Sequence, residues 1–151
     1  MSLDAESRRA VVEYRIERAY KTLEEAKEVA EQGWYNLSAN RLYYALWYVG
    51  SALLISIGHP VKTHSGMIAQ INLHYVKTGI LSLDDGALLS QMFSLRQSSD
   101  YEDFKQVTKE QLEELEPQTR ELVEKLKNLI EFNFNNVEPF KTEDAYGLRE
   151  I

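Results

Sequence analysis

Residues 37–57, LSANRLYYALWYVGSALLISI, decide the fold of this chain. The stretch is apolar nearly all round a helix, and it carries no charged side chain from Leu42 to Ile57. Such a helix must be covered on every side, so the stretch predicts the central core helix of a bundle. The alternative is a membrane span, but the uncharged part is shorter than the roughly 18–20 residues that a span needs, and Asn40 and Arg41 lie at one end. We therefore expect no membrane segment.

Four further helices are predicted around this one. Apolar residues recur at spacings of three and four, and only three prolines and seven glycines interrupt the chain, which favours helices over strands. The predicted helices cover residues 5–31, 37–57, 64–77, 83–97 and 109–132. The sequence thus predicts an all-α fold, an up-and-down antiparallel helical bundle of about five helices. This single domain occupies residues 1–132, and an irregular C-terminal tail follows over 133–151.

Capping residues set the expected helix ends. Gly33 ends the first helix, and either Asn36 or Ser38 caps the next one. Thr63 suits the N-cap of the third helix. Pro117 falls inside the fifth helical pattern, where it either kinks the helix or marks a restart. Two capping boxes are expected, formed by Ser82 with Asp85 and by Thr108 with Gln111.

The composition excludes several classes of function. The chain has no cysteine, which removes disulfides, thiol catalysis and the usual structural zinc sites, and His59 and His74 have no ligand-like partners at useful spacing. We expect no metal, no cofactor and a cytoplasmic location. The net charge of −7 argues against non-specific coating of nucleic acid. Residues 36–101, however, hold 3 acids and 4 bases, which leaves room for a local anion site there.

A first group of candidate site residues lies on the central helix. Arg41, Tyr44 and Tyr48 fall on one stripe at spacings of three and four. Because a nearly uncharged helix has no structural need for an arginine, Arg41 beside Tyr44 is a candidate site pair. For Tyr48 we favour the simpler interpretation of a core residue whose hydroxyl reaches the surface.

A second group opens the third predicted helix. Lys62, Thr63 and Ser65, together with the backbone N–H groups of the first turn, form a candidate anion cradle. His64 shares a stripe with apolar residues of the same helix. It is either a half-buried, capped histidine or a catalytic base.

A third group lies in residues 95–103, LRQSSDYED, where an apolar helical pattern stops. If the helix continues, Arg96 and Asp100 share a face and form a salt bridge that closes the helix end. The alternative is an anion or nucleotide site, because an arginine fork matches phosphate geometry. Gln97 and Tyr101 follow that arginine in the sequence and are candidate ligand contacts.

Three separated motifs carry a resemblance to a known family. They are NRLYYA at 40–45, KTHSG at 62–66 and LRQSSDY at 95–101. In this order, and with helices between them, they resemble the HEPN family (higher eukaryote and prokaryote nucleotide-binding domain), in particular its small stand-alone prokaryotic branch. The likeness covers about residues 7–131. It implies a helical bundle that is usually dimeric, often encoded beside a minimal nucleotidyltransferase, and often part of a toxin–antitoxin or defence system.

The resemblance also implies a chemistry. Many family members resemble metal-independent RNA endonucleases, marked by an arginine on a late helix, a polar residue directly after it, and a histidine a little over one turn beyond. Arg96 and Gln97 match the first two positions, whereas Asp100 and Tyr101 stand where the histidine is expected. His64 replaces that histidine if the start of its helix packs against the end of the fourth helix.

The sequence leaves two functions and one structural alternative open. The first is a nucleotide- or single-stranded-RNA-binding module that acts with a nucleotidyltransferase-type partner. The second is a metal-independent ribonuclease, with Arg96 on the phosphate and His64 or Asp100 in acid–base work. The alternative is a purely structural dimeric scaffold. For the binding module, the phosphate contacts are assigned to Arg41, Lys62 and Arg96, and the stacking contacts to Tyr44 or Tyr101.

Both functions require the candidate residues to converge. Burying their charged groups apart from one another would cost several kcal/mol each. We therefore expect one polar pocket formed by Arg41, Lys62, His64, Arg96, Asp100 and Tyr101. We also expect a symmetric homodimer, because so apolar a central helix leaves surface that a lone bundle of this size cannot cover.

Overall fold

The computed structural model describes residues 4–101 and 106–136, with side chains for all of these except 98–101 and 136. The described residues form five α-helices and one short π-helical segment, and none of them lies in a strand. The elements are α1 (Ala5–Glu31), α2 (Tyr35–Ser56), α3 (His64–Ile71), η1 (Asn72–Val76), α4 (Leu83–Tyr101) and α5 (Lys109–Asn136). The predicted all-α bundle is confirmed.

Helix α2 is the centre of the fold. It contacts α1, α3, α4 and α5. Leu42, Leu46 and Leu53 are fully buried along it, and burial of each such side chain stabilises the fold by about 1.5–3 kcal/mol. Because α2 is covered on all these sides, a charged residue between 42 and 57 would have had to give up its hydration, which explains the absence of charge there.

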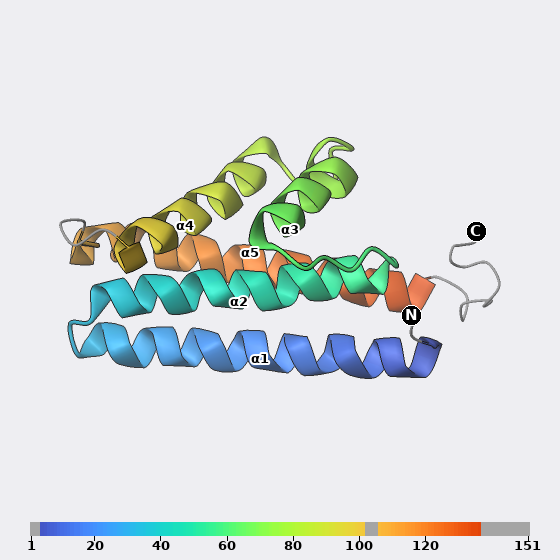
Figure 1. Ribbon diagram of the computed structural model, residues 1–151, viewed down its shortest axis with the longest axis horizontal. Helices are drawn as coiled ribbons and strands as arrows, with labels where there is room; N and C mark the ends of the chain where they lie inside the picture. Colours follow the sequence, from blue (N-terminus) through green and yellow to red (C-terminus); the bar gives the residue numbers. More distant parts are fainter. Residues whose placement is uncertain (1–3, 102–105, 137–151) are drawn as a thin grey trace.

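Two helices, α1 and α5, run along α2, and two others, α3 and α4, are inclined to it (Figure 1). α1 runs antiparallel to α2, and the tight turn between them uses Gly33 at a φ of 85°. α3 and α4 form an arm inclined across α2, and they meet at its outer tip. α5 runs in the same direction as α2, since the arm has brought the chain back to the end where α2 begins.

Helix α3 approaches α2 closely at Gly50. A β-carbon added to Gly50 would lie 2.8 Å from Met67 Sδ and 3.1 Å from Ile71 Cδ1, so a side chain there would require the side chains of α3 to move. Glycine therefore permits the close packing of the two helices. The same packing sets the first residue of α3, His64, against the apolar side of α2.

The predicted cap of α2 is wrong. The helix begins at Tyr35, and Trp34 precedes it without a side-chain cap. Asn36 instead accepts a hydrogen bond from the backbone N–H of Val107, 2.7 Å away, and Ser38 donates to the carbonyl of Ala26 at 2.8 Å. Both side chains bind neighbouring segments rather than their own helix, a tertiary preference that local capping rules do not include.

The third predicted helix, 64–77, is divided. The α-helical pattern ends at Ile71, and the backbone N–H of Lys77 donates to the carbonyl of Asn72 in the wider π pattern. The side chain of Asn72 donates to the carbonyl of Ile68 at 2.9 Å. That carbonyl is the ordinary acceptor for the Asn72 backbone N–H, so the side chain competes with the helical ladder where the pattern changes.

The later helices are longer than predicted. α4 runs to Tyr101 and α5 to Asn136, four residues beyond each predicted end. In the first part of the predicted tail, Asn133 donates to Ser56 Oγ at 2.9 Å and Phe134 packs against the core, and these contacts hold the last turn of α5 in place. The remainder of the predicted tail, 137–151, lies outside the described residues.

Proline 117 lies inside the continuous helix α5, with no restart. Its exposed position leaves the carbonyl at the missing bond open to water, and the side chain of Gln118 donates to the carbonyl of Glu114 in the same turn. The other predicted caps are confirmed: Thr63 caps α3, and the capping boxes of Ser82 with Asp85 and of Thr108 with Gln111 are formed. Within the described ranges, no helix is long and apolar enough to cross a membrane.

Candidate functional site

Two arginines lie over one tyrosine where α2 faces α4. The Cζ atoms of Arg41 and Arg96 are each 5.3 Å from the centre of the Tyr44 ring. Nη2 of Arg96 also donates to the Tyr44 hydroxyl at 3.1 Å. All three side chains are half-buried. Each cation–π contact is worth about 0.5–1 kcal/mol at such a position, and together they concentrate positive charge at one point of a chain that is acidic overall.

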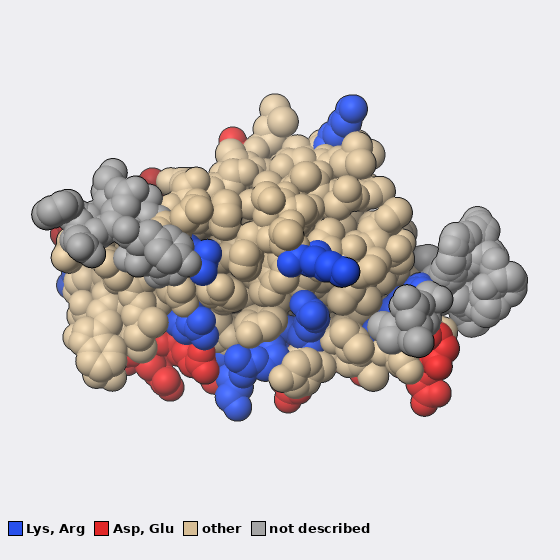
Figure 2. Space-filling view, viewed as in Figure 1, with Lys and Arg blue, Asp and Glu red and all other residues tan. Residues whose placement is uncertain are grey.

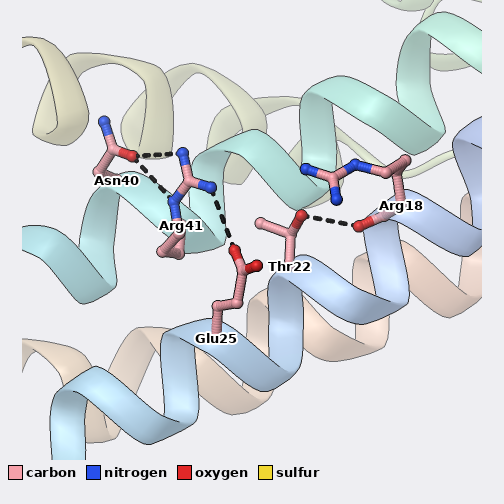
Figure 3. A network of polar contacts seen from close by, with 5 residues as sticks. All are labelled: Arg18, Thr22, Glu25, Asn40 and Arg41. Carbon is pink, nitrogen blue, oxygen red and sulfur yellow. Dashed lines mark hydrogen bonds and ion pairs between the residues drawn. The ribbon is translucent and has the colours of Figure 1, made fainter.

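Arg41 has an acidic neighbour on α1. Its Nη1 donates to Glu25 Oε1 at 3.2 Å, and its Nε and Nη2 donate to Asn40 Oδ1 at 3.1 and 2.9 Å (Figure 3). The arginine and glutamate side chains are 26% and 39% exposed, so water screens the pair and limits its worth to about 1 kcal/mol. The sequence suggested Asp100 as a partner of Arg96, and its side chain lies outside the described part of the structure; at Arg41 the described acidic partner is Glu25.

His64 packs against Tyr44 and Trp47 of α2. Its ring centre is 5.6 Å from that of Tyr44 and 4.5 Å from that of Trp47. Burial lowers the pKa of His64, and the nearby positive charge of Arg96 lowers it further. Since its ordinary pKa is about 6.5, His64 is mainly neutral at pH 7 and able to accept a proton.

A buried tyrosine orients this histidine. The hydroxyl of Tyr43 lies 2.8 Å from Nδ1 of His64. Tyr43 is fully buried, and burial raises its pKa far above the ordinary value, so the hydroxyl keeps its proton. It either donates to Nδ1 or accepts from it, and the second arrangement leaves Nε2 of His64 as the proton acceptor.

The predicted cradle at the start of α3 is mostly separate from this group. The Thr63 hydroxyl accepts from the backbone N–H of Gly66 at 2.9 Å, so it is used as the helix cap. Lys62 and Ser65 are exposed. In the described part of the chain, neither side chain shares the hydrogen bonds and ring contacts that join His64 to Tyr44.

The end of α4 places two predicted residues only by their backbone. α4 continues through Asp100 and Tyr101, so Asp100 follows Arg96 by one helical turn on the same face. The side chains of Asp100 and Tyr101 lie outside the described part of the structure. Gln97 is exposed beside Arg96.

The structure therefore joins four of the candidate residues through a continuous set of contacts: Arg41, Tyr44, His64 and Arg96. Sequence reasoning missed two residues of the same group, Glu25 and Tyr43. Tyr43 stands in the motif NRLYYA and was open to notice there. Glu25 is one of many acids on α1, and only the antiparallel register of α1 and α2 identifies it. Among the described residues, no cluster of three or more metal-ligating acidic, histidine or cysteine side chains is present.

Comparisons with known proteins agree with these observations. A family model for the HEPN domain matches residues 12–129. A UPF0332 protein of Archaeoglobus fulgidus is 35% identical over 122 residues, which cover 81% of this chain and 97% of that relative. A UPF0332 protein of Thermotoga maritima is 31% identical over 121 residues, covering 80% and 92%. A Methanocaldococcus jannaschii protein named "Putative toxin MJ0142" is 29% identical over 100 residues, covering 66% and 68%.

Proposed function

The chain belongs to the HEPN domain family, and we propose that it binds the phosphates of a nucleotide or of single-stranded RNA at the group formed by Arg41, Tyr44 and Arg96. The observation that carries this proposal is the pair of guanidinium groups held 5.3 Å from one tyrosine ring. A guanidinium presents its N–H donors in a fork that matches phosphate oxygens, and at Arg41 a phosphate would replace the bond to Glu25. Tyr44 holds both guanidinium groups at one place, and its hydroxyl accepts a hydrogen bond from Nη2 of Arg96.

The contact of Glu25 with Arg41 supports this proposal. The Glu25 carboxylate accepts a hydrogen bond from Nη1 of Arg41 at 3.2 Å and neutralises part of its charge. A phosphate oxygen offers the same guanidinium a similar bond, and Glu25, being partly exposed, returns to water at little cost. The net charge of −7 and the small number of arginines at the group favour a few local phosphate contacts over a broad duplex surface.

The cellular context is also proposed. Two Methanocaldococcus jannaschii relatives whose names begin with "Putative toxin", together with the resemblance of the three motifs, favour a role in a toxin–antitoxin or defence system in the cytoplasm, beside a nucleotidyltransferase-type partner. We further propose a homodimer. Several large apolar side chains are exposed on the described surface, among them Leu83 at 82% and Ile80 at 58%, and a second copy would cover part of such surface.

The test of binding uses a fluorescein-labelled eight-nucleotide single-stranded RNA and fluorescence anisotropy. Arg96→Ala should fold, as judged by circular dichroism, and bind at least tenfold more weakly, since a hydrogen bond to a charged group is worth about 1.5–3 kcal/mol. Lys27→Ala is the matched control. Lys27 is an exposed cation that lines a hollow between α1 and α5 together with Lys109 and Glu113, away from the proposed contacts. Equal binding by Arg96→Ala and wild type would refute the proposal and favour a structural role for the arginines.

A second function is favoured by one observation, the packing of His64 against Tyr44 with the Tyr43 hydroxyl 2.8 Å from its Nδ1. In a ribonuclease, His64 would accept the proton of a 2′-hydroxyl as its oxygen attacks the adjacent phosphorus, and Arg96 would stabilise the charge on the phosphate oxygens. The bond from phosphorus to the 5′-oxygen would break, giving a 2′,3′-cyclic phosphate and a 5′-hydroxyl that takes its proton from water or from the protonated His64. Tyr43 would hold the ring through Nδ1. Cleavage of the RNA in excess EDTA, lost in His64→Gln and reduced in Tyr43→Phe, would support this chemistry. Binding of the RNA without cleavage would refute the ribonuclease and leave RNA binding as the only proposed function.

A further inference from the structure

A second arginine–tyrosine unit lies along the seam between α1 and α2, beyond the group already described. The Cζ atom of Arg18 is 5.3 Å from the centre of the Tyr48 ring. Farther along, Nη1 of Arg15 donates to Ser51 Oγ at 2.8 Å. On α2, Arg41, Tyr48 and Ser51 contact side chains of α1, and Tyr44 lies on the same helical stripe, where it also meets Arg96 of α4.

The antiparallel register of the two helices explains the alignment. Glu25 lies opposite Arg41, Arg18 opposite Tyr48, and Arg15 opposite Ser51. The contact partners on α1 thus move toward its N-terminus as those on α2 move toward its C-terminus. Figure 3 shows Arg18, from α1, and Arg41, from α2, extending along the same seam. In Figure 2, Lys and Arg side chains gather over the middle of this face, and acidic side chains lie mainly along its lower border.

The dimensions of the seam fit several phosphates in a row. From Arg41 to Ser51, α2 advances by about 15 Å at 1.5 Å per residue, and from Tyr44 to Tyr48 by about 6 Å. A single phosphate at Arg41 and Arg96 would leave Arg18 out of reach. A chain of linked phosphates would pass from the first arginine–tyrosine unit to the second.

We propose that Arg18 and Arg15 extend the site into a track for consecutive phosphates, so that the ligand is single-stranded RNA several nucleotides long rather than a free nucleotide. The inference rests on the proposed function of the Arg41–Tyr44–Arg96 group and names its substrate class. Arg18 lies over the Tyr48 ring, a contact that holds its guanidinium at the seam, and the five N–H donors of a guanidinium exceed what one tyrosine can engage. Arg15 spends one donor on the buried hydroxyl of Ser51 and is the last contact of the track.

A purely structural role makes a different prediction. If Arg18 only packs α1 against α2, its replacement lowers the melting temperature and leaves RNA binding unchanged. If Arg18 contacts a phosphate, its replacement removes the release of counter-ions at that contact. For single strands each contact contributes about 0.7 to the slope of log K against log salt concentration.

The experiment measures that slope by anisotropy with the fluorescein-labelled RNA octamer. The KCl concentration is varied from about 50 to about 300 mM, a range over which the Debye screening length shortens. Arg18→Gln should lower the slope by about 0.7 and the affinity about fivefold near 0.1 M salt. Arg18→Lys should keep the slope, because a lysine retains the point charge. Lys27→Gln, with the same change in net charge, should change neither quantity. Melting temperatures for all variants identify any that fail to fold. If Arg18→Gln fails to fold, Arg15→Gln replaces it, since loss of the last cation of the track should lower the slope by the same amount of about 0.7, and an unchanged slope would refute the track.

The outcomes separate this inference from the proposed function. If Arg96→Ala weakens binding and Arg18→Gln does not, the track is refuted and the first site stands. If neither variant weakens binding, both fail. An equal loss in Lys27→Gln would assign the effect to net charge and refute the track.

Discussion

Replacing Glu25 with glutamine should strengthen RNA binding while it weakens the fold. The Glu25 carboxylate accepts from Arg41 at 3.2 Å and competes with the incoming phosphate. Both side chains are partly exposed, at 39% and 26%, which places the pair in the class worth about 0.2–1 kcal/mol. Removing the competing charge should therefore raise the affinity for the RNA octamer by about 1.4- to 5-fold.

The same substitution removes a tie between α1 and α2. A loss of up to about 1 kcal/mol lowers the melting temperature of a chain of this size by about 2–4 °C. The assay combines anisotropy of the labelled octamer with a thermal melt. The melt is followed by circular dichroism at about 222 nm, where an all-α fold gives a strong signal. Glu28→Gln is the control, because Glu28 is an exposed acid on the same helix with no resolved role in the group. Weaker or unchanged binding by Glu25→Gln, with Glu28→Gln equal to wild type, would refute the competition between carboxylate and phosphate.

Three further predictions concern stability and assembly. The pKa of His64 is lowered in the folded chain by burial and by Arg96, so the protonated histidine is disfavoured there. The contribution of His64 to folding stability should therefore be fully present above its unfolded pKa of about 6.5 and be lost as the pH falls below that value. A melting series from about pH 8 to about pH 5 should show a smaller fall in melting temperature for His64→Gln than for wild type. A parallel curve in His64→Gln would contradict this assignment. Leu46→Ala, at a fully buried position of α2, should cost about 2–5 kcal/mol in urea unfolding, whereas Leu37→Ala on the same helix, where Leu37 is 43% exposed, should cost far less. Light scattering should give about twice the chain mass of 17.5 kDa at tens of micromolar, and a monomer at that concentration would count against the dimer.

The core of the fold was predictable because its signals are local. The uncharged run from Leu42 to Ile57 identified the central helix, and the capping boxes at Ser82 and Thr108 set two helix starts correctly. The start of α2 was not predictable in this way, since Asn36 and Ser38 had suitable side chains that bind other segments instead. Capping rules describe one helix at a time, and tertiary hydrogen bonds can override them.

The candidate site divides along the same line. Arg41, Tyr44, His64 and Arg96 were identifiable because each polar group interrupts an apolar helix. Glu25 was not, because its role depends on the register of α1 and α2, and Tyr43 stood in the motif NRLYYA without a local signal for its bond to His64. Arg18 and Arg15 belong with them: on α1 they read as ordinary surface charges, and only their contacts with Tyr48 and Ser51 connect them to the seam.

The most direct test of the central claim is a titration of the arginine side-chain Nε–Hε signals by NMR, with the unlabelled RNA octamer added to the ¹⁵N-labelled protein. Arg120, which donates to Glu116 and to the carbonyl of Leu23, is the internal reference. Phosphate binding at the proposed group predicts that the signals of Arg41 and Arg96 shift together with one dissociation constant while that of Arg120 stays in place. Unchanged Arg41 and Arg96 signals in the presence of bound RNA would contradict the account.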